Sequence, residues 1–252
     1  MANNGGDGRM KFVADLHTHT ISSGHAYSTV LENVRAAADK GLEMIAITDH
    51  GPSMPGAPHP YYFGNLKVLP KELFGVRILK GVEANIIDRE GTLDLPTDRL
   101  ALLDIVLAGL HNVCSPFGSI EENTKMMINA IKNPWVDVIV HPGNPDFLID
   151  AEAVVQAAVT YDVALEINNS SLKVSRVGSK PYCEKILGLA KEYGAKIMVG
   201  TDSHFSLAIG DFTEALALLE QYQIAPSSVM NTTIKGITDH LARRSNRRPR
   251  SK

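Results

Sequence analysis

Short, nearly continuous runs of apolar residues recur along the chain, and segments with apolar residues at helical spacing lie between most of them. Seven runs have the composition of strands buried on both faces of a sheet; they are residues 10–17, 42–50, 76–86, 103–111, 136–143, 163–171 and 195–204. Helical spacing occurs in residues 29–41, 122–133, 150–162, 181–194 and 211–223. Several of these segments begin near Ser, Asp or Pro and end at Gly or Asn, as helices do.

The alternation of strands and helices predicts an α/β fold with a parallel sheet. Because no linker divides the seven strands, we expect a single domain over residues 10–242, built as a closed or nearly closed, TIM-like (β/α)7 barrel. Residues 51–65, GPSMPGAPHPYYFGN, are the exception, and their prolines and glycines predict an irregular loop rather than a helix. A long loop after a barrel strand usually belongs to the rim of the active site.

Composition narrows the class of protein. The chain has 252 residues, of which 44% are hydrophobic and 21% charged, as in soluble globular proteins. No apolar run is long enough to span a membrane. The first ten residues, MANNGGDGRM, contain no apolar signal segment, and residues 1–9 are predicted to be a disordered polar tail. Two cysteines, Cys114 and Cys183, cannot form a disulfide framework, so we expect a cytoplasmic protein.

Positive charge is concentrated at the C-terminal end. The last ten residues, RRSNRRPRSK, carry six positive charges and no acid, so a total of −3 leaves −9 on residues 1–242. A body this acidic argues against nucleic acid as the partner. Residues 243–252 are predicted to be a basic, disordered tail, with no assigned role.

Six of the nine histidines stand at the C-terminal end of a predicted strand: His17, His19, His50, His111, His141 and His204. His25 follows the first pair, and two carboxylates, Glu83 and Asp202, also end strands. The C-terminal ends of barrel strands face one common mouth, so these side chains should converge there. The side chains of residues i and i+2 of a strand point the same way. His17 and His19 could therefore bind one metal ion, as could Asp202 and His204.

Imidazole and carboxylate together suit Zn²⁺, Mn²⁺ or Fe²⁺. A lone histidine in a strand is more often a hydrogen-bonded core residue, but this many polar groups in one mouth are costly to bury unless something coordinates them. Nine candidate ligands with one bridging carboxylate are enough for two or three ions. His59, in the loop, is interpreted as a rim residue, and His240, in a terminal helix, as an ordinary surface histidine. Asp15, Asp49, Glu166 and Asn168 are expected to orient ligating histidines.

These motifs resemble the polymerase and histidinol phosphatase (PHP) superfamily. The resemblance rests on HTH at 17–19, TDHG at 48–51, GVEAN, AGLH, VHPGNP and TDSH at 201–204, and it covers about residues 11–240. DLHTHTISSGHAYSTV, AITDHGPSMPGAPH and ALEINNSS are similar to its YcdX-like branch, which consists of metal-dependent phosphatases. The resemblance implies a distorted barrel of seven strands with three metal ions at the C-terminal strand ends.

All nine positions match the ligand pattern of the family. The resemblance implies that His17, His19, Glu83 and Asp202 hold the first ion, that Glu83, His111 and His141 hold the second, and that His25, His50 and His204 hold the third. Glu83 would bridge two ions. Zinc is the metal most associated with this branch, and manganese and iron occur in relatives; the sequence does not choose among them.

The expected activity is hydrolysis of a phosphate ester by water that the ions activate, most simply a phosphatase acting on a small phosphorylated metabolite. Arg176 is a candidate for binding the phosphate as a bidentate fork, with a solvated loop arginine as the alternative. Lys173 is a weaker candidate for the same role. His59 is a candidate for protonating the leaving alkoxide.

Two other functions stay open. One is a phosphodiesterase or exonuclease, although no basic groove or row of stacking aromatic residues accompanies the metal motifs. The other is a regulatory module that binds metal without turnover, against which the complete ligand set argues. The sequence leaves the oligomeric state open, with a homo-oligomer among the alternatives.

Overall fold

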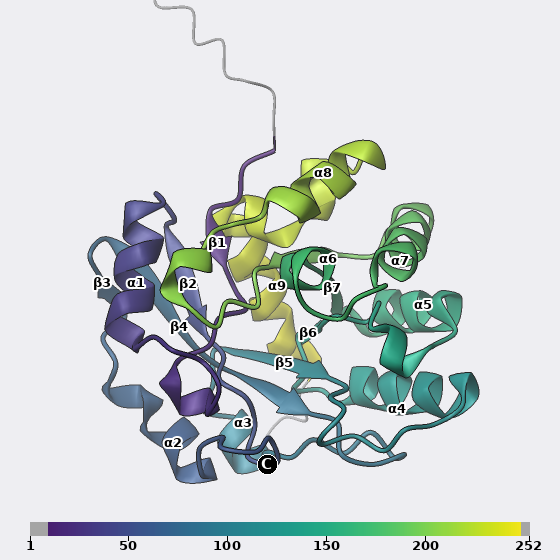
Figure 1. Cartoon of the computed structure of the whole chain (residues 1–252), viewed down its shortest axis with the longest axis horizontal. Coiled ribbons are helices and arrows are strands. Elements are labelled where there is room, and N and C mark those ends of the chain that lie inside the picture. Colours follow the sequence, from purple (N-terminus) through teal and green to yellow (C-terminus); the bar gives the residue numbers. More distant parts are fainter. Residues whose placement is uncertain (1–9, 248–252) are drawn as a thin grey trace, which may run out of the picture.

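Seven parallel strands form a nearly closed, distorted TIM-like barrel, as the alternation of elements predicted (Figure 1). The computed structural model describes residues 10–247, so the segments 1–9 and 248–252, for which disorder was predicted, lie outside the described residues. In the order in which they pair, the strands are β1 (Ala14–Asp15), β2 (Met44–Ile47), β4 (Val76–Asn85), β5 (Ile105–Gly109), β6 (Val138–Ile139), β7 (Ala164–Asn168) and β8 (Ile197–Gly200). A short strand, β3 (Glu72–Leu73), pairs antiparallel with β4 outside this path.

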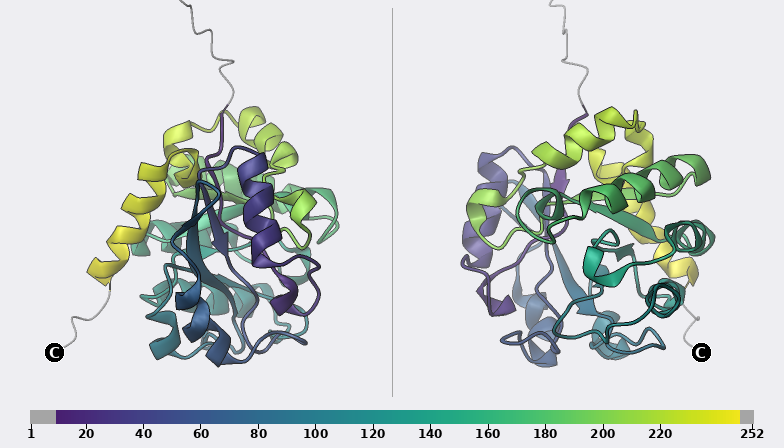
Figure 2. Two further views of the ribbon diagram at one scale, coloured as in Figure 1. Left: turned by 90° about the vertical axis from the view of Figure 1, so that its left-hand side faces the viewer. Right: turned by 45° about the vertical axis from the view of Figure 1, so that its right-hand side comes forward.

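Helices surround the sheet in the positions between strands (Figure 2). The five predicted helical segments correspond to α1 (Val30–Asp39), α4 (Ile120–Lys132), α5 (Ala151–Tyr161), α7 (Lys180–Tyr193) and α8 (Thr213–Gln221). The others in the described residues are α2 (Pro60–Asn65), α3 (Thr97–Leu100), α6 (Asn169–Lys173) and α9 (Ile234–Arg247). Both α1 and α4 begin with a capping box, in which the residue before the helix and a glutamate three residues later satisfy each other's backbone N–H groups.

The prediction that residues 51–65 are irregular throughout is wrong for their second half, which forms α2. Pro60 occupies the first turn, where its missing N–H is no loss, and the Nδ1 atom of His59 accepts a hydrogen bond from the backbone N–H of Tyr61. Phe63 is buried in the apolar layer outside the sheet, which holds the helix in place. Apolar burial therefore outweighs the local preference of the prolines and glycines for a loop.

Two apolar layers stabilise the barrel. The larger lies between the sheet and the surrounding helices, and the smaller fills the barrel interior. The interior layer includes Leu16, Met44, Leu107 and Met198, which are all at most 1% exposed. Since the interior is filled by side chains, the barrel is a packed core and not a pore.

Helix α9 covers the end of the barrel at which the strands begin. Its residues Ile237 and Leu241 line a groove together with Arg77 and Asp104, which lie at the start of β4 and just before β5. His240, on the same helix, is 2% exposed, and its Nε2 atom lies 2.9 Å from the backbone oxygen of Asp137. The expectation of a surface histidine is therefore wrong, because α9 packs this face onto the sheet.

Helix α9 also corrects the predicted start of the C-terminal tail. The helix continues to Arg247, so residues 243–247 are helical and not disordered. The Nη1 atom of Arg243 lies 3.1 Å from a carboxylate oxygen of Asp162, at the end of α5. Part of the basic segment thus belongs to the folded body.

The barrel closes through a short backbone bridge and an asparagine side chain. Strands β1 and β8 end the sheet order, and over residues 10–247 they form no ladder, but one parallel bridge joins Thr18 to Ser203. Asn231, which is fully buried, spans the seam between the two strands. Its Oδ1 accepts from the N–H of Val199 at 3.1 Å, and its Nδ2 donates to the backbone oxygens of Val199 and Ala14 at 2.8 and 2.9 Å. One asparagine thus replaces strand pairing that the seam lacks.

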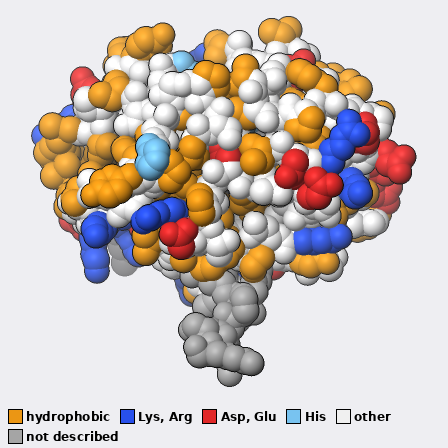
Figure 3. Space-filling view, turned by 90° about the horizontal axis from the view of Figure 1, so that it is seen from below, with side chains coloured by type: hydrophobic (Ala, Val, Ile, Leu, Met, Phe, Trp, Pro, Cys, Tyr) orange, Lys and Arg blue, Asp and Glu red, His pale blue; other side chains and the backbone are white. Residues whose placement is uncertain are grey.

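The surface shows no long run of one charge on the face of Figure 3, where acidic and basic side chains are interspersed with apolar ones. Among the described helices, none has the length and apolar character needed to cross a bilayer.

Candidate metal centre

Glu83 lies at the centre of the histidine cluster, near the C-terminal end of β4. Its carboxylate is fully buried and contacts five imidazole rings. One oxygen, Oε1, lies 3.0 Å from Nε2 of His111 and 2.8 Å from Nε2 of His141. The other, Oε2, lies 2.7 Å from Nδ1 of His50 and 3.4 Å from the Nε2 atoms of both His17 and His19. The two oxygens thus face different groups of histidines, as the two oxygens of a bridging carboxylate do.

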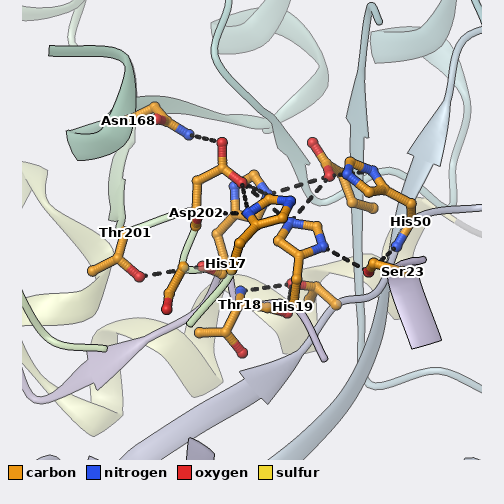
Figure 4. Close-up of polar contacts among 12 residues, drawn as sticks. His17, Thr18, His19, Ser23, His50, Asn168, Thr201 and Asp202 are labelled. Atoms are coloured by element: carbon orange, nitrogen blue, oxygen red, sulfur yellow. Dashed lines mark hydrogen bonds and ion pairs between the residues drawn. The ribbon is translucent and has the colours of Figure 1, made fainter. Parts of the chain in front are cut away.

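Asp202 forms the second carboxylate of the cluster, just after β8. Its Oδ1 lies 3.2 Å from Nε2 of His19 and 3.5 Å from Nε2 of His17, whereas its Oδ2 faces Arg176 at 2.9 Å and Asn168 at 3.3 Å (Figure 4). One oxygen is therefore directed at histidines and the other is held by hydrogen-bond donors.

Two further rings, those of His25 and His204, complete the cluster toward solvent. The ring of His25 stacks on those of His50 and His204, with centroids 5.0 and 4.8 Å apart, and the ring of His204 lies 4.3 Å from that of His19. His25 is exposed and lies in the segment between β1 and α1. The barrel thus brings together all nine residues that the sequence analysis selected.

The donor atoms of this cluster fit divalent transition-metal ions. Five buried side-chain atoms lie close to one another but make no hydrogen bond of standard geometry: Nε2 of His17, Nε2 of His19, Nδ1 of His50, Oε2 of Glu83 and Oδ1 of Asp202. Buried polar atoms are rarely left in this state, because each costs the free energy of its lost hydration. Nitrogen and oxygen donors of this kind are ligands for Zn²⁺, Mn²⁺ or Fe²⁺, which would satisfy all of them.

Donor atoms within 4.8 Å of one another form three overlapping groups, which are His17 with His19 and Glu83, His50 with Glu83 and His111, and His19 with His50 and His204. These contain six of the nine expected ligands. The other three, His25, His141 and Asp202, lie against members of these groups. His50 therefore stands between Glu83 and His204.

The environment of the cluster favours ionised carboxylates and shifts the histidines in both directions: burial alone would lower the pKa of His17, but Glu166 and Glu83 raise it well above its ordinary value, whereas burial lowers the pKa of other rings. Burial alone would raise the pKa of Glu83, but the surrounding histidines hold it well below its ordinary value; the pKa of Asp202 is likewise lowered, against its burial, by His17 and an arginine. Burial lowers the pKa of His19 well below its usual value and that of His141 to about 3. Neutral rings retain the lone pair that a metal requires.

A hydrogen-bond chain fixes the proton of His19. The Asp49 carboxylate accepts from the hydroxyls of Ser23 at 2.7 Å and Tyr62 at 2.6 Å. Because the single hydroxyl proton of Ser23 is donated to Asp49, its oxygen accepts from Nδ1–H of His19 at 3.0 Å and from the backbone N–H of His50 at 3.2 Å (Figure 4). Nε2 of His19 is therefore unprotonated and directed at the carboxylates of Glu83 and Asp202.

Glu166, on β7, holds two other histidines of the cluster. Its Oε1 accepts from Nδ1 of His17 at 2.7 Å, which leaves Nε2 of that ring free. Its Oε2 accepts from the backbone N–H of His141 at 2.8 Å and from the side chain of Asn168 at 3.0 Å. Gly200 allows this approach, since a Cβ atom there would lie 2.2 Å from Oε1 of Glu166. Glu166 thus contacts His17 in the way that the expected orienting role requires.

The remaining carboxylate partners act on the backbone around the cluster. Asp15 is fully buried and accepts from the hydroxyl of Thr201 at 2.5 Å and the N–H of Gly210 at 3.1 Å, which ties β1 to the segment after β8. Asp49 also accepts from the N–H of Thr20 at 2.7 Å. These two acids therefore position the loops that carry the clustered histidines.

Arg176 lies at the edge of the cluster and lines a cavity of about 600 Å³ that opens at the mouth of the barrel. Its Nη1 donates to Asp202 at 2.9 Å and to the hydroxyl of Ser171 at 3.1 Å. The cavity is also lined by His25, His50, His111, Asp202 and His204. A guanidinium and residues of the histidine cluster thus share one solvent-accessible space.

Three residues of this site have left-handed backbone conformations that non-glycine residues rarely adopt. Their φ angles are 34° at His141, 46° at Arg176 and 54° at Asp202. Strained backbone of this kind persists where surrounding contacts hold it, and it is frequent at functional sites.

Two other candidates lie away from the cluster. His59 is exposed, caps α2 and does not line the cavity. Lys173 lines the rim, where its Nζ pairs with Asp211 at 2.7 Å.

The sequence analysis missed Ser23 and Tyr62. A serine beside His25 and a tyrosine in a Pro- and Gly-rich segment carry no spacing signal, because their contacts with Asp49 depend on how the loops fold back.

Comparison with known proteins identifies the family. The PHP domain model matches residues 15–225. A probable phosphatase of Caldanaerobacter subterraneus subsp. tengcongensis is 55% identical over 237 residues, which cover 93% of this chain and 93% of the relative. A probable phosphatase of Thermoanaerobacter sp. (strain X514) is 57% identical over 233 residues, which cover 92% of this chain and 95% of the relative.

Among solved structures, the fold is similar to histidinol phosphate phosphatase from Lactococcus lactis subsp. lactis Il1403, complexed with Zn, L-histidinol and phosphate. The TM-score is 0.59 at 18% identity, over 84% of this chain and 94% of that one. Because the PHP model covers most of the barrel and the bacterial relatives align over nearly their whole length, the chain belongs to the PHP domain family.

Proposed function

We propose that the protein is a metal-dependent phosphomonoesterase that acts on a small phosphorylated metabolite at a site for three divalent ions. The convergence of nine ligating side chains, several with buried donor atoms that make no hydrogen bond of standard geometry, beside an arginine-lined cavity carries this proposal. It is supported by the relatives named as probable phosphatases and by the fold shared with an enzyme solved with Zn and phosphate. Zinc is the first candidate, with manganese and iron as alternatives.

The proposed ligand sets follow the family pattern. His17, His19, Glu83 and Asp202 would hold one ion, Glu83, His111 and His141 a second, and His25, His50 and His204 a third. The distances of both Glu83 oxygens to separate histidines support its bridging role. His50 contacts Glu83 as well as the ring of His25, so it is the member that would couple the third ion to the other two.

Each part of the site has a role in hydrolysis. Bound divalent ions activate water and neutralise charge on the phosphoryl group. Arg176 would donate to a phosphate oxygen from a guanidinium that Asp202 and Ser171 hold in a fixed orientation. Glu166 and the chain through Ser23 hold His17 and His19 with their Nε2 lone pairs inward. His59 is not part of the proposal, because its exposed ring does not line the cavity.

The shape of the mouth favours a monoester over a nucleic acid. A cavity of about 600 Å³ is of the size that holds a small molecule.

Assays of phosphomonoester against phosphodiester hydrolysis, with elemental analysis of metal content, test the proposal. We expect monoester turnover that is lost with a chelator and restored by zinc or manganese, and more than one ion per chain. Asp202→Asn should lose metal and activity, whereas Asp239→Asn, an exposed acid on α9, should lose neither. Preferential diester hydrolysis would favour the nuclease alternative, and metal binding without any turnover would favour the regulatory module.

A further inference from the structure

Asn168 is a buried amide at the junction of β7 and α6. Its Oδ1 atom accepts from the backbone N–H of Ser171 at 2.8 Å. Because a backbone N–H can only donate, this contact identifies the carbonyl oxygen of the amide. The other amide atom is therefore Nδ2, which donates to Oε2 of Glu166 at 3.0 Å and to Oδ2 of Asp202 at 3.3 Å (Figure 4). One amide thus holds two carboxylates that lie on different strands or just after them.

The hydroxyl of Ser171 has one possible direction. It lies 3.0 Å from Oδ1 of Asn168, which has no hydrogen to give, so the hydroxyl proton is donated to the amide. The serine oxygen accepts in turn from Nη1 of Arg176 at 3.1 Å. The same Nη1 donates at 2.9 Å to Oδ2 of Asp202, the oxygen that the amide also contacts. Four side chains therefore form a closed ring of hydrogen bonds: Asn168, Ser171, Arg176 and Asp202.

The ring holds the guanidinium of Arg176 by a single nitrogen. Nη1 also lies 3.1 Å from the hydroxyl of Ser175, so its contacts are all to the protein. Nη2 and Nε make no hydrogen bond within the described part of the chain, and the residue lines the cavity. A planar guanidinium that is fixed at one nitrogen presents its other donors in one plane, which suits two oxygens of a phosphate.

We propose that Asn168 and Ser171 are positioning residues, which hold Arg176 in the orientation that binds phosphate and keep Oδ1 of Asp202 directed at the histidine cluster. The inference rests on the proposed phosphatase function and deepens it, because neither residue would contact the substrate or a metal ion. Asn168 acts through Ser171 on the arginine and directly on the aspartate. Since the ring is closed, the phosphate-binding group and a proposed metal ligand belong to one network.

The affinity for inorganic phosphate measures this positioning without turnover. Isothermal titration calorimetry of the zinc-loaded protein gives the Kd of phosphate, and elemental analysis gives the number of ions per chain. We expect Ser171→Ala to raise this Kd by about tenfold, because the arginine loses an acceptor that fixes its plane. Metal content should stay unchanged, since Asp202 keeps its contact with Asn168.

Ser175→Ala is the matched control. It removes a contact of the same length to the same nitrogen of Arg176, but its hydroxyl lies outside the ring and has no second partner in the described residues. Water can replace a contact of this kind, so the Kd of phosphate should change by less than about twofold. An equal loss of affinity in Ser171→Ala and Ser175→Ala would overturn the inference.

A double-mutant cycle separates an effect through the ring from general damage to the site. Asn168→Ala should raise the Kd of phosphate, and adding Ser171→Ala to it should change that Kd by less than about twofold further, because the serine has already lost its anchor. If Asn168→Ala does not fold, the comparison of the two serine variants still decides. Additive effects, or an unchanged Kd in Ser171→Ala, would overturn the inference and leave the phosphatase function standing. A zinc-loaded wild type that neither binds phosphate nor hydrolyses any monoester would contradict the proposed function as well.

Discussion

At the scale of single residues, Glu83 has the largest number of partners in the site. Five imidazoles contact its two oxygens, and no other acid in the described chain lies against so many of them. A change at this position therefore acts on every proposed ion that the carboxylate would bridge. Removing the charge of Glu83 should therefore lower metal content and activity more than replacing any single histidine does.

We expect Glu83→Gln to bind fewer ions than the wild type and to lower kcat by at least about 100-fold, since an amide carries no charge to hold two cations. Metal content by elemental analysis and kcat on a monoester measure this. Glu220→Gln, at an exposed position on α8, is the control. Full metal content with wild-type turnover in Glu83→Gln would show that the carboxylate is not a bridge.

Ser23 gives a second prediction at this scale. Ser23→Ala removes the acceptor that holds the Nδ1 proton of His19, so the ring can turn or adopt the other tautomer. We expect zinc affinity to fall by about 10–100-fold, as is usual when a partner of a ligating histidine is lost. Competition with a chromogenic chelator measures this directly.

Tyr62→Phe should weaken zinc binding less, because it removes a donor to Asp49 and leaves the serine in place. Ser227→Ala, exposed near the start of β8 beside Lys196, is the control for the serine change. A Ser23→Ala protein with unchanged zinc affinity would contradict the role of the chain in fixing the tautomer.

Candidate ligands were predictable from the sequence, whereas their supporting contacts were not. His17, His50, His111, His141 and Asp202 end strands, and the topology of a barrel alone brings such ends together. The contacts of Ser23 depend instead on a 3-10 turn, η1 (Ile21–Ser23), that has no periodic pattern. The backbone strain at Asp202 is likewise invisible in a sequence, because the residue type does not require it.

At the scale of helices and strands, caps account for the accuracy of the predicted helices. The predicted segments 29–41 and 122–133 contain or adjoin the capping boxes of α1 and α4. Helix α2 was missed because its first turn depends on a histidine cap and on burial of Phe63, neither of which a Pro- and Gly-rich segment announces. Helices with their own capping residues can thus be predicted from local sequence, whereas a helix such as α2 forms because its apolar side chain is buried in the folded protein.

The capping box of α4 predicts a pH-dependent contribution to stability. The backbone N–H of Ser119 lowers the pKa of Glu122 below the ordinary glutamate value of 4.5. A depressed folded-state pKa means that the stabilisation is fully present above 4.5 and is lost as the pH falls through the folded-state pKa. Glu122→Gln should therefore unfold at lower urea concentration than the wild type at pH 7.

The difference in urea midpoint between Glu122→Gln and the wild type should shrink when both are measured below pH 4.5. Glu121→Gln, in the same first turn but outside the capping box, is the matched control and should shift the midpoint less. A difference that is the same at pH 7 and at low pH would show that the charge of Glu122 does not stabilise the helix.

At the scale of the whole molecule, the barrel depends on its seam. Asn231 satisfies backbone groups of two strands that form no ladder with each other in the described chain. Asn231→Ala leaves three buried backbone groups without partners, and we expect it to lower the free energy of unfolding by about 3 kcal/mol.

Urea denaturation followed by circular dichroism measures this change, with Asn65→Ala, exposed at the end of α2, as the control. Because the seam lies beside His17 and Asp202, the variant should also bind metal more weakly. A variant as stable as the wild type would mean that water or neighbouring groups satisfy the seam as well as the asparagine does.

The same seam links folding of the barrel to assembly of the proposed metal centre. Ala14 and His17 belong to the first strand region, Asp202 and Asn231 follow the last strand, and 217 positions separate Ala14 from Asn231. Contacts between such distant positions form late, because the entropy of closing a long loop is lost before they are made. The set of proposed ligands is therefore complete only when β1 and the segment after β8 have come together. We expect closure of the barrel and uptake of metal to occur together, so that a chain with an open seam binds metal weakly.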